Sequence, residues 1–145
     1  MNRIGRLVVD RATEECLNDT VIHSGTLIIN SENIHLKDLI KVNGNLVINS
    51  GGFYAPNLVE VTGDVVFGGF DKLFKVTRLF THGQYLCILS KLKTIGGDLV
   101  INGRTISVEM KSLTTVNGCI SLCQCNKLKA PKLIVHNGKP SFKVV

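Results

Sequence analysis

The stretch Leu92-Lys93-Thr94-Ile95-Gly96-Gly97-Asp98-Leu99-Val100-Ile101 carries the pattern that decides the fold. A Leu is followed three positions later by a branched aliphatic residue, and a Gly anchor comes two positions after that. Beyond the Gly, apolar side chains return at every second position. This period of two, built from Leu and β-branched residues, is typical of a strand with one buried face. The stretch therefore predicts a β-strand at Gly97.

The same pattern recurs along almost the whole chain. The anchors of its copies are Gly5, Gly25, Gly44, Gly63, Arg78, Gly97, Gly118 and Gly138. Their spacings are 20, 19, 19, 15, 19, 21 and 20 residues, and a Leu-x-x-Val/Ile signature precedes most of them. A unit of about 20 residues is too short for two helices. It matches one turn of a β-solenoid, whose turns stack at the strand spacing of ~4.8 Å.

We therefore expect an all-β chain with a single domain over residues 1–145. The domain should be a right-handed parallel β-solenoid of about eight turns of 19–21 residues each. Asn-Gly pairs are also typical of hairpins, but hairpins would not need the fixed spacing. Residues 11–24 break the pattern, so we expect an irregular loop or a short capping helix there. Residues 139–145 form the C-terminal end.

Composition excludes several classes of protein. The chain has 145 residues, of which 44% are hydrophobic and 19% charged, which is too apolar for a disordered protein. No run approaches the ~18 apolar residues of a membrane span, and no apolar stretch typical of a signal peptide follows the N-terminus. The five Cys are odd in number and scattered, which favours reduced thiols. We therefore expect a cytoplasmic protein without a membrane partner.

Placing the copies in register assigns residues to columns along the coil. The positions two and four after each anchor are apolar and should form the core, with Phe80 and His82 as their members in the irregular fifth copy. The Gly column marks a place where only hydrogen fits or where φ is positive. The position five after the anchor should form a ladder of side-chain hydrogen bonds; it holds Asp10, Asn30, Asn49 and Asn102.

One outward column is aliphatic where a polar residue would be expected on a water-facing sheet. It lies three positions after the anchors and contains Val8, Ile28, Val47, Val66 and Val100. Either residues 11–24 cover this column or it is an interaction surface. We expect an interface with a protein partner, and a homodimer is the simplest case because a two-fold contact sets the patch against itself.

Charge is unevenly distributed along the chain. Residues 1–71 hold five Lys/Arg and nine Asp/Glu, and residues 72–145 hold twelve and two, so −4 and +10 sum to the net +6. The candidate basic patch contains Lys72, Arg78, Lys91, Lys111, Lys129 and Lys132. It is either a solvated edge that blocks end-to-end pairing or a seat for phosphates or an acidic protein. Aromatic residues are only 6%, and none interleaves with the lysines as in single-strand binders.

Residues that could perform chemistry are not arranged for it. The sequence contains no phosphate-binding loop, dinucleotide fingerprint or nucleophile elbow. Asp64 and Asp98 share a column but should lie two turns apart, ~9.6 Å, which is unfavourable for a carboxylate pair. The four His lack metal spacing, and we expect His23 and His136 in or near the core. We therefore expect no enzyme, no metal and no cofactor.

The segments 92–101 and 113–118 resemble the repeats of receptor L domains and of leucine-rich-like β-solenoids. The resemblance covers most of residues 25–138 and implies a solenoid fold with a habit of binding, without implying an activity. The small size also resembles phage or mobile-element accessory proteins, some of which inhibit host defence complexes such as CRISPR-type effectors. The expected function is thus non-enzymatic binding of a protein, acidic or a nucleoprotein, with nucleic-acid binding by the basic half as the alternative.

Overall fold

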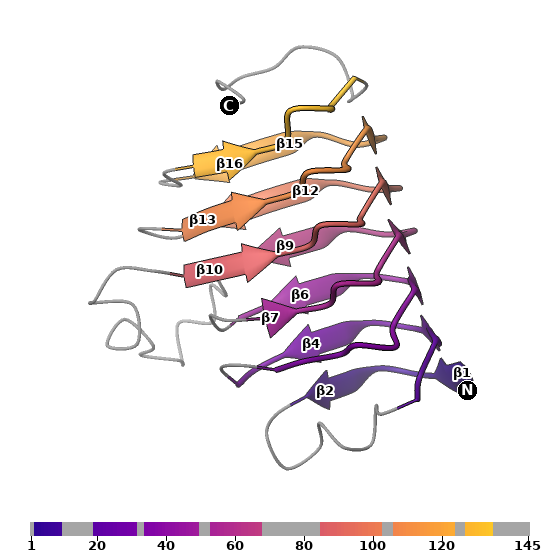
Figure 1. The fold of residues 1–145 in the computed structure, drawn as a ribbon. Coiled ribbons are helices and arrows are strands. Elements are labelled where there is room, and N and C mark those ends of the chain that lie inside the picture. Colours follow the sequence, from indigo (N-terminus) through magenta and orange to yellow (C-terminus); the bar gives the residue numbers. More distant parts are fainter. Residues whose placement is uncertain are drawn as a thin grey trace.

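The computed structural model describes residues 2–9, 19–31, 34–49, 53–67, 85–102, 106–123 and 127–134. Figure 1 shows their strands stacked in layers, from the N-terminal end at the bottom to the C-terminal end at the top. These residues form strands, turns and bends, with no helix among them, and every strand pair is parallel. The chain is a parallel β-solenoid, as the repeat predicted.

Three sheets form the sides of the coil. Sheet A contains β1 (Asn2–Ile4), β3 (Ile22–Ser24), β5 (Lys41–Asn43), β8 (Glu60–Val61), β11 (Thr94–Ile95) and β14 (Thr115–Val116). Sheet B contains β2 (Leu7–Val9), β4 (Leu27–Ile29), β6 (Leu46–Ile48), β9 (Val65–Phe67), β12 (Leu99–Asn102) and β15 (Ile120–Cys123). Sheet C contains β7 (Phe53–Tyr54), β10 (Tyr85–Ile88), β13 (Ile106–Glu109) and β16 (Lys127–Lys129).

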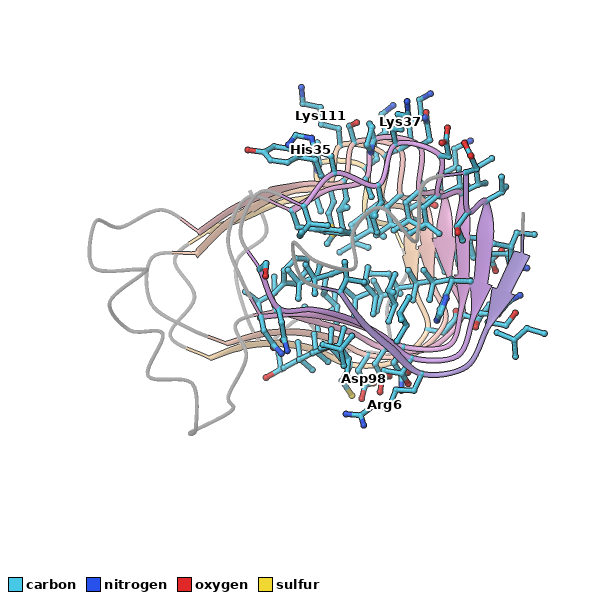
Figure 2. The ribbon with its side chains drawn as sticks, turned by 90° about the horizontal axis from the view of Figure 1, so that it is seen from below. Arg6, His35, Lys37, Asp98 and Lys111 are labelled. Carbon is cyan, nitrogen blue, oxygen red and sulfur yellow. The ribbon has the colours of Figure 1, made fainter. Side chains whose placement is uncertain are left out.

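The chain visits the sheets in the order A, B, C and then returns to A one level higher. Figure 2 views the coil from its N-terminal end, with Lys37 and Lys111 just before sheet A and Arg6 and Asp98 just after it. Seen this way, the chain turns clockwise as it recedes, so the coil is right-handed. This agrees with the usual hand of parallel crossovers.

The described coil has six levels in sheets A and B, where about eight turns were predicted. β9 pairs directly with β12, so that Val65 lies beside Leu99. The repeat expected at Arg78 therefore adds no strand between β9 and β12, and its expected core members Phe80 and His82 lie outside the described residues. A 15-residue unit is too short for a circuit that otherwise takes 19–21 residues. Residues 68–84, like the repeat expected at Gly138, lie outside the described residues.

The prediction of an irregular segment over residues 11–24 is wrong for its C-terminal part. β3 belongs to sheet A, where His23 lies between Arg3 of β1 and Val42 of β5. The side chains of Thr20 and His23 are 1% and 0% exposed. They occupy the inward positions that Leu39 and Val42 fill one level higher. Because both positions are polar, a pattern based on apolar residues does not detect this level. Residues 10–18 lie outside the described part of the chain.

The core consists of the inward columns that the repeat predicted. Sheet B contributes its first and third strand positions, and the buried members are Val9, Leu27, Ile29, Leu46, Ile48, Val65, Phe67, Leu99, Ile101 and Ile120. The corner before sheet A and sheet A itself contribute Leu39, Val42, Leu58, Val61, Leu92, Ile95, Leu113 and Val116. These side chains form one continuous cluster along the coil. Burial of His23 within it confirms its predicted place, while His136 lies outside the described residues.

The glycines at the corner between sheets A and B show both features predicted for their column, a positive φ and a lack of room for a side chain. Gly25 has φ +121°, and a Cβ on it would lie 2.6 Å from the carbonyl oxygen of Gly5 in the level below. A Cβ on Gly44 would in turn meet the carbonyl oxygen of Gly25. The backbones of successive levels approach so closely here that a side chain has no room.

Candidate functional site

A ladder of side-chain acceptors runs along the corner between sheets A and B, one residue after each glycine. The Oδ1 atom of Asn45 accepts a hydrogen bond from the N–H of Asp64 at 2.8 Å, and Oδ1 of Asp64 accepts one from Asp98 at 2.8 Å. Oδ1 of Asp98 accepts a third from Cys119 at 2.8 Å. Each side chain thus ties its own level to the next, which is a structural role for both carboxylates.

This ladder corrects the predicted position of the two aspartates. Asp64 and Asp98 lie on adjacent levels and not two turns apart, because the repeat expected between them is not a level of the coil. Among the described residues, no group of three or more His, Cys, Asp or Glu side chains is placed to hold a metal ion.

We expect Asp64→Ala to lower the free energy of unfolding by about 0.5–1.5 kcal/mol, because the N–H of Asp98 loses its acceptor. Asp64→Asn should cost less, since the amide keeps an Oδ1 atom and Asn45 already holds this position one level below. Urea denaturation of the two variants measures the difference. Equal losses for both variants would show that the hydrogen bond contributes nothing to stability.

A second ladder follows the other edge of sheet B, just after its strands end. Nδ2 of Asn49 donates a hydrogen bond to Oδ1 of Asn30 at 2.9 Å, which confirms the predicted amide ladder at this step. Asp10 and the side chain of Asn102, its other expected members, lie outside the described part. Polar ladders therefore border the outer face of sheet B on both sides.

Between these ladders lies the aliphatic column, formed by Val8, Ile28, Val47, Val66 and Val100. The strand register places each of these residues directly beside the next, and Ser121 continues the column at the last level. Val8 is 38% exposed, and the other four are partly exposed. The structure therefore brings all five predicted interface residues together on one outward face.

A second surface is the corner between sheets C and A, which we call the lysine corner. It consists of the five stacked segments 36–40, 55–59, 89–93, 110–114 and 130–134. A β-turn opens each segment, closed by a hydrogen bond of 3.1–3.4 Å from the N–H of the Leu in fourth position to the carbonyl of the first residue. Five exposed lysines project from this corner: Lys37, Lys91, Lys93, Lys111 and Lys132.

The lysine corner gathers half of the predicted basic patch. Lys91, Lys111 and Lys132 lie on three consecutive levels of it, and Nζ of Lys91 donates a hydrogen bond to Oδ1 of Asn57 at 3.1 Å. Lys129 ends β16 immediately before the last segment, and its side chain is not among those described. Lys72 and Arg78 lie outside the described residues.

An aromatic pair that was not predicted from the sequence lies beside this corner. The rings of His35 and Tyr54 stack with centroids 4.5 Å apart and planes 17° apart. Each residue immediately precedes a segment of the lysine corner, and a β-bridge joins the two. Figure 2 shows His35 on the same side of the coil as Lys37 and Lys111. The sequence feature that could have revealed this pair is their equivalent position: each lies one residue before a turn segment, and they are 19 residues apart.

The fold defines the chain as a solenoid repeat protein. No family model, curated protein or solved structure matches it. Within the part of the chain that the structure describes, no helix has the length and apolar character needed to cross a membrane.

Proposed function

We propose that the protein is a non-enzymatic binding scaffold, and that the outer face of sheet B binds a second copy of the chain. The aliphatic column is the observation that carries the proposal. Water-facing sheets usually alternate apolar and polar side chains, yet this face repeats an aliphatic residue on five successive levels. Contiguous apolar surface of this kind marks a binding site. The resemblance to receptor L-domain repeats supports a protein partner.

The place of the column on its face favours a two-fold contact. It is the middle one of the outward columns of sheet B, between the ladder of Asp64 and Asp98 and that of Asn30 and Asn49. A two-fold axis in the plane of the face therefore sets the column of one protomer on that of its partner. When the axis runs parallel to the strands, the first level of one protomer faces the last level of its partner. Arg6 then approaches the upper levels of the partner, which carry the partner's Asp98.

The dimension of the face predicts a weak dimer. Six strands at ~4.8 Å spacing span about 24 Å along the coil, and the outward width of each short strand is about 10 Å. This is a few hundred Å² for each protomer, below the ~800 Å² of a standard interface. The dissociation constant should therefore lie at about 1 μM or above.

Sedimentation velocity from about 5 to about 200 μM protein tests the proposal. The wild-type chain should shift from monomer to dimer over this range. Val47→Lys combined with Val66→Lys should remain monomeric, with a dissociation constant raised at least about tenfold, because two lysine charges would be desolvated in the contact.

The control pair is Thr62→Lys combined with Asn117→Lys. It adds the same charge at two exposed positions that follow strands of sheet A, away from the aliphatic column. This variant should dimerise like the wild type. A folded wild-type protein that stays monomeric at the highest concentration, or a control that dissociates equally, would contradict a second copy as the occupant.

A further inference from the structure

We propose that the upper three levels of the lysine corner bind the phosphate backbone of single-stranded nucleic acid. This surface lies at the corner between sheets C and A, whereas the aliphatic column lies on the outer face of sheet B, so it does not depend on dimer formation. Its segments are 89–93, 110–114 and 130–134, which together contain four lysines and no Asp or Glu. All four lysines, Lys91, Lys93, Lys111 and Lys132, are exposed.

Hydrogen bonds between levels fix the positions from which these lysines project. The N–H of Thr114 donates to the carbonyl of Lys93 at 3.0 Å, and the N–H of Ile134 donates to the carbonyl of Thr114 at 3.0 Å. Because the levels are ~4.8 Å apart, the ammonium groups form a row along the coil and not an isolated cluster. A row of regularly spaced cations on a rigid backbone matches a linear chain of phosphates.

The lower levels of the same corner are not cationic in the same way. Asp38 follows Lys37 directly in segment 36–40, and segment 55–59 contains no Lys or Arg. Positive charge without an acidic neighbour in the same segment therefore begins at Lys91. This difference places the phosphate seat at the C-terminal end of the corner.

The stacked rings of His35 and Tyr54 favour a single strand over a duplex. The backbone register places Tyr54 beside Ile88, the residue that precedes segment 89–93, so the ring pair lies one level below the first lysines. His35 is exposed, and unpaired bases stack on such rings, whereas bases within a duplex cannot. A strand running along the corner would therefore meet cations at its upper part and an aromatic platform at its lower end.

Fluorescence anisotropy with a labelled oligothymidylate of about 20 nucleotides tests the inference. If about three phosphates are neutralised, affinity should fall about 20-fold between about 50 and about 200 mM salt, from a slope of about −0.7 per phosphate. A duplex of the same length should bind at least about fivefold more weakly, because its bases cannot reach the ring pair.

The informative variant combines Lys111→Ser and Lys132→Ser. Each change copies a residue that the fold already uses at the same turn position, Ser90 and Ser112 respectively, so the coil should be preserved. The variant should bind at least about tenfold more weakly at about 50 mM salt, with a shallower salt slope. Arg6→Ser combined with Lys41→Ser removes the same charge elsewhere and should change affinity less than about twofold.

Four results would overturn the proposal. The first is no binding of the oligothymidylate at about 50 mM salt, where such contacts are strongest. The second is equal loss in the two charge-matched variants, which would assign binding to net charge alone. The third is competition by poly-glutamate of equal charge that is as strong as competition by unlabelled oligothymidylate, which would assign the corner to acidic proteins. The fourth is a duplex that binds as tightly as the single strand, which would assign the corner to duplex.

Discussion

Leu46→Asp should abolish the folded state, whereas Val47→Asp, one residue further along the same strand, should leave the coil folded. Leu46 is fully buried and its register neighbours are Leu27 and Val65 in the levels below and above. A carboxylate at this position would have no partner, at a cost of several kcal/mol against a total stability of about 5–15 kcal/mol. Val47 points outward, so its carboxylate stays in water.

Far-UV circular dichroism and urea denaturation of both variants measure this difference. Ile101→Asp and Val100→Asp repeat the comparison two levels higher, because Ile101 is also fully buried and Val100 belongs to the aliphatic column. A Leu46→Asp protein with a strand spectrum and a cooperative urea transition at neutral pH would contradict the assignment of the inward columns.

Gly25→Ala is expected to cost clearly more stability than Gly5→Ala, although both glycines have positive φ. Gly5 has φ +109° and no atom within 4 Å of the position of a Cβ, so its substitution adds only backbone strain of about 1–2 kcal/mol. At Gly25, with φ +121°, the new Cβ would also press on the Gly5 carbonyl. Overpacking of this kind adds about 1–3 kcal/mol.

The free energy of unfolding of the two alanine variants, from urea curves under one buffer condition, isolates the second effect. Because the strain term is shared, the difference between the variants reports how tightly successive levels are stacked at this corner. Equal losses at Gly5 and Gly25 would mean that the backbones can move apart without cost, which a hydrogen-bonded stack does not allow.

The period of two and the regular spacing were sufficient to predict the class of fold, the core columns and the aliphatic column. In a coil, the side on which a residue lies depends only on its place in the repeat, so register converts directly into position. The aliphatic column could be found for this reason. Lys91, Lys111 and Lys132 could be grouped because each lies one or two residues before a Leu of the repeat.

The number of levels, the aspartate neighbours and the aromatic pair depend on how the chain completes each turn of the coil. A local sequence pattern does not contain this information. Leu73 and Val76 reproduce the signature of a repeat, but 15 residues cannot complete three sides, so the ladder passes from Asp64 to Asp98 directly. Counting this repeat as a level also placed Asp64 and Asp98 two levels apart, although they lie on adjacent levels. His35 and Tyr54 hold equivalent places 19 residues apart, but pairing their rings requires knowing that the residues before each turn stack as a further side of the coil.

The direct step from β9 to β12 has a consequence for how the chain assembles. Most steps of the ladder join residues 19–21 positions apart, whereas this step joins residues 34 apart. By loop-closure entropy, the additional length costs only about 0.5 kcal/mol, because the penalty grows with the logarithm of loop size. Nearest-neighbour contacts dominate a coil, so folding can propagate from level to level on either side of the long step. We therefore expect the coil to accept inserted sequence between β9 and β10 with little change in stability.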